Sequence, residues 1–126
     1  MLAEGEGPEA AVGDLVLVDY VIRRSNGYFI YSTVEGVSFQ PRDVPVGPVA
    51  FRLGDGRLVP GLEGSIVGMR RGAKRRVLVP AEAAYAPNPA AEPQPPTTSG
   101  RRQVLAHQAE PFLFEVQVLR ITPGKA

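Results

Sequence analysis

The chain has 126 residues, a formal net charge of +1 at pH 7 and no cysteine. This length suits one domain that buries about two-thirds of the surface of its unfolded chain, and a nearly neutral charge gives no reason to expect nucleic acid as a partner. Without cysteine, disulfide bonds, thiolate catalysis and cysteine-ligated metals are excluded. The single histidine, His107, has no neighbours at the spacing of a metal site or a catalytic triad, so neither a metal nor a cofactor is expected. No apolar run approaches the ~20 residues that span a bilayer, so no transmembrane segment is expected.

Short strands dominate the predicted secondary structure. Period-two alternation and β-branched or aromatic composition predict strands over residues 14–23, 28–33, 49–53, 74–80 and 112–121. In the first strand one face carries Val16, Val18, Tyr20 and Ile22. Asn26 and Gly27 separate the first two strands and predict a tight turn, because both residues tolerate a positive φ.

One helix is expected, over residues 61–69, directly after Pro60. Leu62, Ile66 and Met69 fall on one stripe of this helix, at positions i, i+4 and i+7. Residues 86–110 are rich in proline and alanine and have no steady period, which predicts a long loop. Together the elements predict an α+β fold, in which an antiparallel sheet packs on one short helix.

We expect the chain to divide into three parts. A flexible N-terminal leader covers residues 1–12, one domain covers residues 13–122 and carries the loop 86–110 as an insert, and a C-terminal tail covers residues 123–126. The leader lacks the basic and apolar regions of a signal peptide. Two interpretations stay open: a cytoplasmic protein with a loose leader, or a mature chain whose targeting segment has been removed.

A cluster of basic residues lies between the expected helix and the next strand. It comprises Arg70, Arg71, Lys74, Arg75 and Arg76. Nucleic-acid sites usually interleave aromatic side chains with such charges, and this segment has none. We therefore interpret the cluster as a solvated turn.

Several short motifs follow one another along the chain. They are VDY at residues 18–20, ST at 32–33, FRLG at 51–54, LVPGLE at 58–63, GM at 68–69, VP at 79–80, AY at 84–85 and LFEV at 113–116. In this order and spacing they resemble the FKBP-type (tacrolimus-binding) peptidyl-prolyl cis-trans isomerases over about residues 13–122.

The resemblance implies a twisted antiparallel sheet wrapped around one short helix, with an apolar pocket between them. It also implies rotation of X-Pro peptide bonds, whose uncatalysed barrier is ~18–20 kcal/mol. The twisted transition state has lost amide resonance and is less polar than the ground state. A dry aromatic pocket with a few hydrogen-bond donors therefore stabilises the transition state without covalent or acid–base chemistry.

Residues of the implied site follow from the matching motif positions. The resemblance makes Tyr20, Tyr85 and Phe114 the catalytic aromatic residues. It places the substrate-binding positions at Ile30, Tyr31, Val49, Leu58, Val59 and Leu62. Val59 matches the residue whose backbone N–H contacts the ligand. Tyr20 and Phe114 fit a purely structural core equally well, and either Phe29 or Ile30 can line the pocket.

The sequence departs from the family pattern at several of these positions. Tyr31 stands where the family has aspartate, Leu62 where strongly active members have tryptophan, and Ile30 and Val49 where they have aromatic residues. We therefore expect a peptidyl-prolyl isomerase of weak or narrow activity. The alternative is a non-catalytic FKBP-fold assembly factor that docks on a photosynthetic protein complex.

Three loop features are similar to the chloroplast branch of the family: FIYST at residues 29–33, SFQPRD at residues 38–43, and the arginine-rich exit of the expected helix. They imply a chloroplast location, in the thylakoid lumen, with a cytoplasmic location as the alternative. The expected partners are proline-containing polypeptide clients, and a photosynthetic membrane-protein complex that binds through loop 86–110. The domain is expected to be a monomer.

Overall fold

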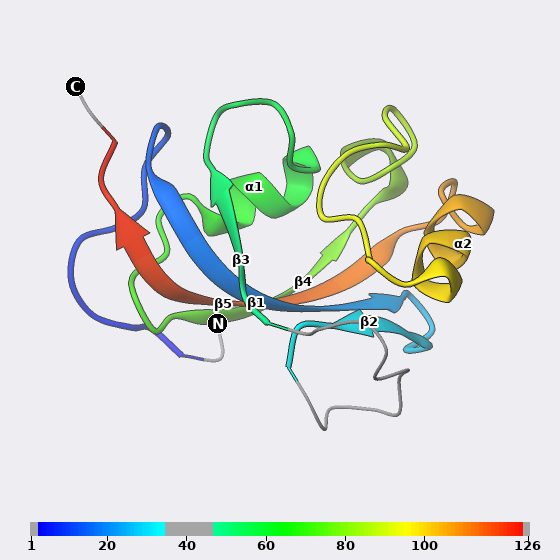
Figure 1. Ribbon diagram of the computed structural model, residues 1–126, viewed down its shortest axis with the longest axis horizontal. Helices are drawn as coiled ribbons and strands as arrows, with labels where there is room; N and C mark the ends of the chain where they lie inside the picture. The colour runs from blue at the N-terminus through cyan, green and yellow to red at the C-terminus, as the bar shows by residue number, and fades with distance from the viewer. Residues whose placement is uncertain (1–2, 35–46, 125–126) are drawn as a thin grey trace.

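A computed structural model describes residues 3–34 and 47–124 of the chain (Figure 1). Its strand β1 (Leu15–Arg24) pairs along one edge with β5 (Phe112–Thr122). The other edge of β1 is shared by β2 (Phe29–Ser32) and β3 (Val49–Arg52), while β4 (Lys74–Val79) pairs with β5. These five strands pair only in antiparallel fashion, and four of them follow one another in the sheet in the order β2-β1-β5-β4. The predicted α+β class and all five predicted strands are confirmed. The SFQPRD motif lies outside the described residues.

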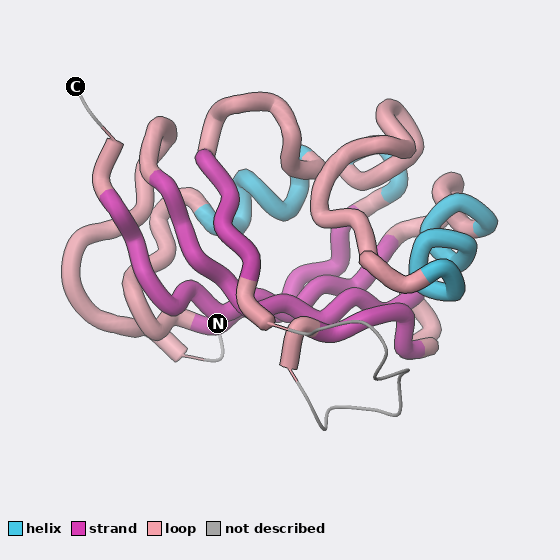
Figure 2. The backbone as a smooth tube through the Cα atoms, viewed as in Figure 1, coloured by secondary structure: helices cyan, strands magenta, loops and turns pink. Residues whose placement is uncertain are grey.

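The sheet curves around helix α1 (Pro60–Ile66), which lies in its concave side (Figures 1 and 2). The side chains of β1 that alternate toward α1 are buried, namely Val16, Val18, Tyr20 and Ile22. The pairing of β1 with β5 shifts register between Leu17 and Val18, and such a bulge adds to the local twist of the strands. The period-two face predicted from the sequence is therefore the face that covers the helix.

Helix α1 is shorter than predicted. Leu62 and Ile66 are buried in it, and Met69 is buried in the turn that follows. Gly68 has φ +91°, in the left-handed region that ends helices and that favours glycine. The i, i+4, i+7 stripe is thus correct as a core pattern, but its last residue lies beyond the helix.

Gly61 is required by the close approach of α1 to the sheet. A Cβ at this position would meet the Val79 side chain and would lie 3.1 Å from the Ala83 carbonyl oxygen. We expect Gly61→Ala to destabilise the domain by about 1–3 kcal/mol, the usual cost of overpacking. Gly64→Ala is the control, because a Cβ there meets nothing within 4 Å and alanine is the better helix former by about 1 kcal/mol. Urea unfolding measures both. Equal effects of the two variants would contradict the packing explanation.

A second helix, α2 (Thr98–Ala106), corrects the prediction of one helix and lies within the predicted long loop 86–110. The Thr97 side chain caps α2 by accepting a hydrogen bond from the Gly100 N–H at 3.0 Å, and Val104 is fully buried. The helix lies over the end of the sheet near β2 (Figure 1). Its mean hydropathy is low, and packing stabilises it more than propensity does.

The strand β4 is joined to α2 by a short 3₁₀ helix, η1 (Ala81–Ala83), and by an ordered segment in which Ala91, Pro93, Pro95 and Thr97 are buried. The Glu92–Pro93 peptide bond is cis. The first part of the insert, residues 86–90, is exposed. Among the described residues no helix is long and apolar enough to cross a membrane.

Residues of the N-terminal segment pair with the connection between α1 and β4. Ala3 bridges to Lys74 and Glu6 to Arg71. Ala10 is buried, and its N–H donates to the Met69 carbonyl at 2.7 Å. These contacts place residues 3–10 against the domain, while the division of the chain at residues 12 and 122 stays a prediction.

Candidate functional site

Five of the implied site residues come together between α1 and the sheet. Tyr20 lies on β1, Phe114 on β5, Val59 just before α1, Leu62 on α1, and Tyr85 after η1. All five belong to one apolar cluster, and none is more than 3% exposed. We call these five residues the pocket cluster. Segments far apart in the sequence converge here because β1 and β5 pair along their whole length under α1.

Aromatic contacts fix the rings of the pocket cluster. The Tyr85 ring meets Phe112 edge-on at 5.2 Å between centroids and lies 6.4 Å from Phe114. The Tyr20 ring lies 5.9 Å from Tyr31 at 51°. Tyr31, which the resemblance places at the family's aspartate position, therefore adds a second ring beside Tyr20. Such contacts contribute about 0.5–1.5 kcal/mol each beyond the burial of area.

Thr33 positions the strand residue Tyr20. The Thr33 hydroxyl accepts a hydrogen bond from the Tyr20 N–H at 2.9 Å and donates to Asp19 Oδ1 at 2.8 Å. The Thr33 N–H donates to the Tyr20 carbonyl at 3.0 Å. The VDY and ST motifs are thus joined in space, and this contact holds the backbone of Tyr20 in place.

The pocket cluster keeps its hydroxyl groups protonated. Burial raises the pKa of Tyr85 well above its ordinary value, and burial with the neighbouring Tyr31 raises the pKa of Tyr20. A buried phenol that stays neutral can donate a hydrogen bond at any ordinary pH. The cluster therefore offers apolar walls and hydroxyl donors, and its chemistry is that of binding and polarisation rather than proton abstraction.

The other implied positions divide into two groups. Ile30, Tyr31 and Leu58 are buried and belong to the same apolar cluster. The alternation of residues 49–53 predicts that Val49 faces inward with Phe51 and Leu53. Val49 is 36% exposed at the start of β3, so this prediction is wrong. Phe29 is half-buried, and its ring lies 5.6 Å from the Arg23 guanidinium instead of in the apolar cluster. Of the two candidates Phe29 and Ile30, the buried cluster contains Ile30.

A backbone contact that the sequence did not reveal closes the site on one side. The Val59 N–H donates to the Glu92 carbonyl at 2.8 Å, and the Glu92 N–H donates to the Arg57 carbonyl at 2.6 Å. The Tyr85 hydroxyl donates to the Pro93 carbonyl. This pairing joins residues 57–59 to residues 92–93 as a short parallel bridge. In the sequence this contact is indicated only by Pro93, Pro95 and Pro96, because closely spaced prolines favour extended backbone.

A cavity of about 560 Å³ lies beside this contact. Its lining includes Val49 and Phe51 of β3, the β3–α1 connection at Asp55 and Arg57, and Glu92. Apolar and charged residues line it in equal number. Among the described residues no group of three or more His, Asp or Glu side chains gathers as a metal site would require.

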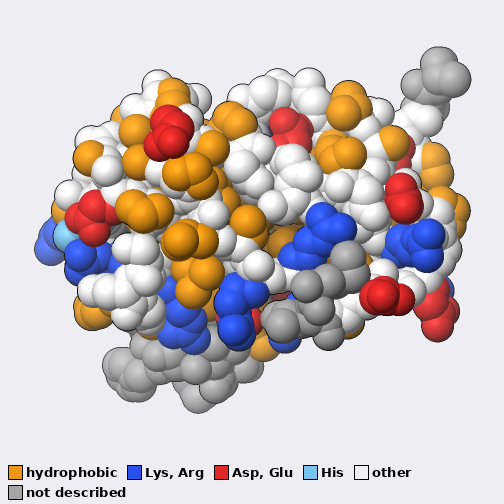
Figure 3. Space-filling view, turned by 180° about the vertical axis from the view of Figure 1, so that it is seen from behind, with side chains coloured by type: hydrophobic (Ala, Val, Ile, Leu, Met, Phe, Trp, Pro, Cys, Tyr) orange, Lys and Arg blue, Asp and Glu red, His pale blue; other side chains and the backbone are white. Residues whose placement is uncertain are grey.

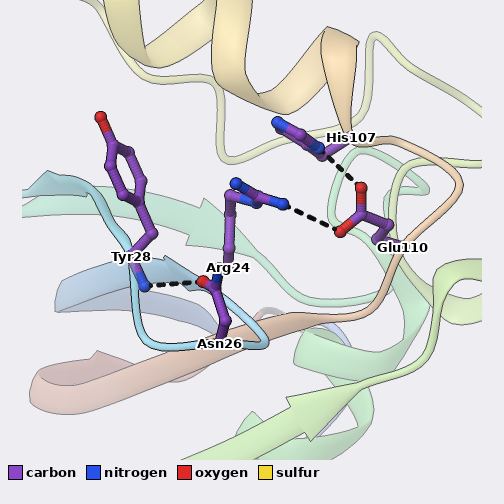
Figure 4. A network of polar contacts seen from close by, with 5 residues as sticks. All are labelled: Arg24, Asn26, Tyr28, His107 and Glu110. Atoms are coloured by element: carbon purple, nitrogen blue, oxygen red, sulfur yellow. Dashed lines mark hydrogen bonds and ion pairs between the residues drawn. The ribbon is translucent and has the colours of Figure 1, made fainter.

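A polar network ties the end of α2 to β1 (Figure 4). The Glu110 carboxylate accepts a hydrogen bond from Arg24 at 3.3 Å and lies 2.6 Å from Nδ1 of His107. These two partners, His107 first, hold the pKa of Glu110 below its ordinary value of 4.5. In the adjoining turn the Asn26 side chain accepts a hydrogen bond from the Tyr28 N–H at 3.0 Å.

Glu110 predicts a defined loss of stability in acid. Because its folded-state pKa is lowered, its stabilising contribution is present above the unfolded pKa and is lost as the pH falls through the folded pKa. We expect the melting temperature of the wild type to exceed that of Glu110→Gln at about pH 6 and the difference to shrink below about pH 4.5. Glu4→Gln, on the exposed N-terminal segment, controls for the loss of one charge. A difference that persists unchanged at about pH 3 would contradict the assignment.

The basic side chains at residues 70–76 are exposed, apart from the partly buried Arg75. Basic and acidic side chains are interspersed on the face of the molecule that Figure 3 shows. Arg76 lies 2.9 Å from Glu115 and Arg70 lies 3.7 Å from Glu9. Arg75 donates to the Ser65 carbonyl at the end of α1 at 2.6 Å. These charges bind neighbouring parts of the same chain.

Comparison with known proteins shows the family to which the chain is similar. A family model described as FKBP-type peptidyl-prolyl cis-trans isomerase matches residues 7–119. The chain is 42% identical over 120 residues to the chloroplastic peptidyl-prolyl cis-trans isomerase FKBP16-1 of Arabidopsis thaliana, covering 95% of this chain and 55% of that protein. It is 33% identical over 126 residues to the photosynthetic NDH subunit of lumenal location 4 from the same plant. This match covers 95% of this chain and 51% of that protein. The chain thus spans about half the length of these relatives.

A solved structure supports the fold. The crystal structure of FkpA from Escherichia coli superposes with a TM-score of 0.64 at 23% identity, covering 98% of this chain and 46% of that one. The family model covers most of the chain, and the paired strands around α1 are those that the motifs implied. The chain belongs to the FKBP-type peptidyl-prolyl cis-trans isomerase family.

Proposed function

We propose that this domain is a peptidyl-prolyl isomerase of low activity that acts on proline-containing polypeptides. The observation that carries the proposal is the convergence of Tyr20, Val59, Tyr85 and Phe114 in one dry cluster between α1 and the sheet. An apolar site favours the less polar, twisted transition state over the planar amide. The Val59 N–H and the Tyr85 hydroxyl are the donors that hold the carbonyl groups on either side of the rotating bond.

Low activity follows from the residues that line the cluster. Leu62 presents an aliphatic floor where strongly active members have tryptophan, Tyr31 replaces the aspartate, and Val49 is exposed at the edge. Each change removes part of the surface or the electrostatic complementarity that would stabilise the transition state. The donors remain, so the activity is reduced rather than abolished.

Location and partners form the finer part of the proposal. The relatives named above are chloroplastic, and one is a subunit of lumenal location, which supports folding or assembly work in the chloroplast, in the thylakoid lumen. That relative is also named as a subunit of a photosynthetic complex. On this chain the insert presents an exposed apolar side chain, Leu105 on α2, as a contact for such a partner.

Isomerisation of a short X-Pro peptide, with and without the macrocyclic family inhibitor, tests the proposal. We expect measurable catalysis that the inhibitor suppresses, and about a tenfold loss of kcat/KM in Phe114→Leu, which removes one aromatic wall. Tyr28→Leu is the control, because it removes an exposed ring from the β1–β2 hairpin outside the cluster. An unchanged rate in Phe114→Leu would place the active surface elsewhere. A wild type with no catalysis would favour the non-catalytic assembly factor.

A further inference from the structure

The two donors of the proposed site are already occupied by the chain itself. The Val59 N–H is bound to the carbonyl of Glu92, the residue before a proline, and the Tyr85 hydroxyl is bound to the carbonyl of that proline, Pro93. The Glu92 N–H completes the pairing by donating to the Arg57 carbonyl. An X-Pro unit of the insert thus makes the contacts that a client's X-Pro unit needs.

Burial leads to the same conclusion. The lining residues Val59, Tyr85 and Phe114 have no exposed surface, and Leu62 has 1%. Ala91, Pro93 and Pro95 are themselves buried. A client therefore cannot reach the walls of the pocket cluster while residues 91–95 stay in place.

Helix α2 holds these residues from the C-terminal side. A Cβ added to Gly100 would lie 2.7 Å from both Pro95 Cβ and Thr97 Oγ1, so the first turn of α2 packs directly on Pro95. The buried Val104 holds the later part of α2 against the domain, and the contact of Glu110 with Arg24 holds the turn that follows the helix. On the N-terminal side, residues 86–90 are exposed, so this part of the insert can change its conformation when residues 91–95 move.

We propose that residues 91–95, Ala-Glu-Pro-Gln-Pro, are a built-in ligand of the prolyl site. Clients are extended X-Pro segments that pair with residues 57–59, place the carbonyl after proline on Tyr85, and bind only by displacing this segment. The proposal rests on the proposed function, because it places the client in the same pocket cluster. A site that is free for 1–10% of the time binds its client about tenfold to a hundredfold more weakly than the open site.

The test compares three proteins: the wild type, a variant with residues 91–95 replaced by Gly-Ser-Gly-Ser-Gly, and a matched variant with the exposed residues 86–90 replaced by the same linker. The probe is the blocked pentapeptide Ala-Glu-Pro-Gln-Pro, with Ala-Glu-Ala-Gln-Ala as the control peptide. We expect the 91–95 variant to bind the probe at least about tenfold more tightly than the other two proteins, and to bind the control peptide poorly. The kcat/KM for an X-Pro peptide rises in the same variant.

Gly100→Ala provides a second route that keeps the segment intact. The added methyl group pushes on Pro95, so affinity for the probe rises relative to the wild type. We expect the Val59 amide, whose N–H donates to the Glu92 carbonyl, to exchange slowly with solvent deuterium in the wild type and faster in the 91–95 variant. The Leu62 amide, which is bonded to the Val59 carbonyl at 3.1 Å, is the internal reference and keeps its rate.

The outcomes separate this inference from the proposed function. Equal binding of the probe by all three proteins, or binding by none, overturns the built-in ligand. If all three proteins also isomerise peptides at the same rate, the proposed function stands without it. Tight binding by the 91–95 variant without isomerisation by any protein upholds the built-in ligand and overturns catalysis.

Discussion

Isomerisation of a short X-Pro peptide by this domain is expected to be about a hundredfold slower than by family members whose pocket carries the tryptophan, the aspartate and the additional aromatic residue. We attribute the expected deficit to three positions: Leu62, Tyr31 and Val49. If each lowers the stabilisation of the transition state by about 1 kcal/mol, the sum corresponds to about two decades of rate. Leu62 and Tyr31 lie in one buried cluster, so their effects need not add and the figure sets a scale.

An NMR exchange assay or a protease-coupled assay at matched temperature measures the rate. Because residues 91–95 also lower the rate in our account, the assay is repeated on the variant with the Gly/Ser replacement of these residues. The deficit that remains belongs to the pocket side chains. Turnover equal to that of the strongest family members in the wild type would contradict the weakened pocket.

Phe112→Ala is expected to destabilise the domain by about 3–5 kcal/mol, a large part of the 5–15 kcal/mol that holds a typical domain folded. Phe112 has no exposed surface, pairs with Val79 of β4, and receives the edge of the Tyr85 ring. Its removal leaves a cavity where β5, β4 and the segment after η1 meet, and the surroundings can close that cavity only in part.

Denaturant unfolding followed by circular dichroism measures this loss. The control is Leu78→Ala, because Leu78 lies one residue from Val79 on the same strand but is 56% exposed. A surface change of this kind stays within about 0.5 kcal/mol. Similar losses in both variants would mean that Phe112 does not anchor the core.

Most of the sheet was predictable from the sequence because its long strands, β1 and β5, each have their own period-two alternation of buried residues. In β1 the buried residues Val16, Val18, Tyr20 and Ile22 alternate, with Val21 buried as well, and in β5 Phe112, Phe114, Val116 and Val118 alternate. Helix α2 was not predictable in this way. Its residues include glycine and two arginines and form no apolar stripe, so its stability depends on Val104, the Thr97 cap and contacts distant in sequence.

The candidate site divides along the same line. Tyr20, Leu62 and Phe114 lie on regular elements whose patterns already pointed inward, and Tyr85 was identified by its motif. Val49 was misplaced because the alternation of β3 does not reveal where its buried part begins. The hydrogen bond of Val59 with Glu92 joins two backbone segments that are 33 residues apart in the sequence. A backbone hydrogen bond between irregular segments imposes no periodic pattern on the side chains, so the side-chain pattern does not reveal it.

The central claim is that an X-Pro ligand binds between α1 and the sheet, on Val59 and Tyr85. Titration of the labelled domain with the macrocyclic family inhibitor, followed by backbone amide and aromatic NMR shifts, tests it most directly. The account predicts that the largest shifts occur at the Val59 amide, the Tyr85 ring and residues 91–95, with saturation at one site. Shifts confined to the cavity beside β3 or to the turn at residues 70–76, with Val59 and Tyr85 unmoved, would contradict it.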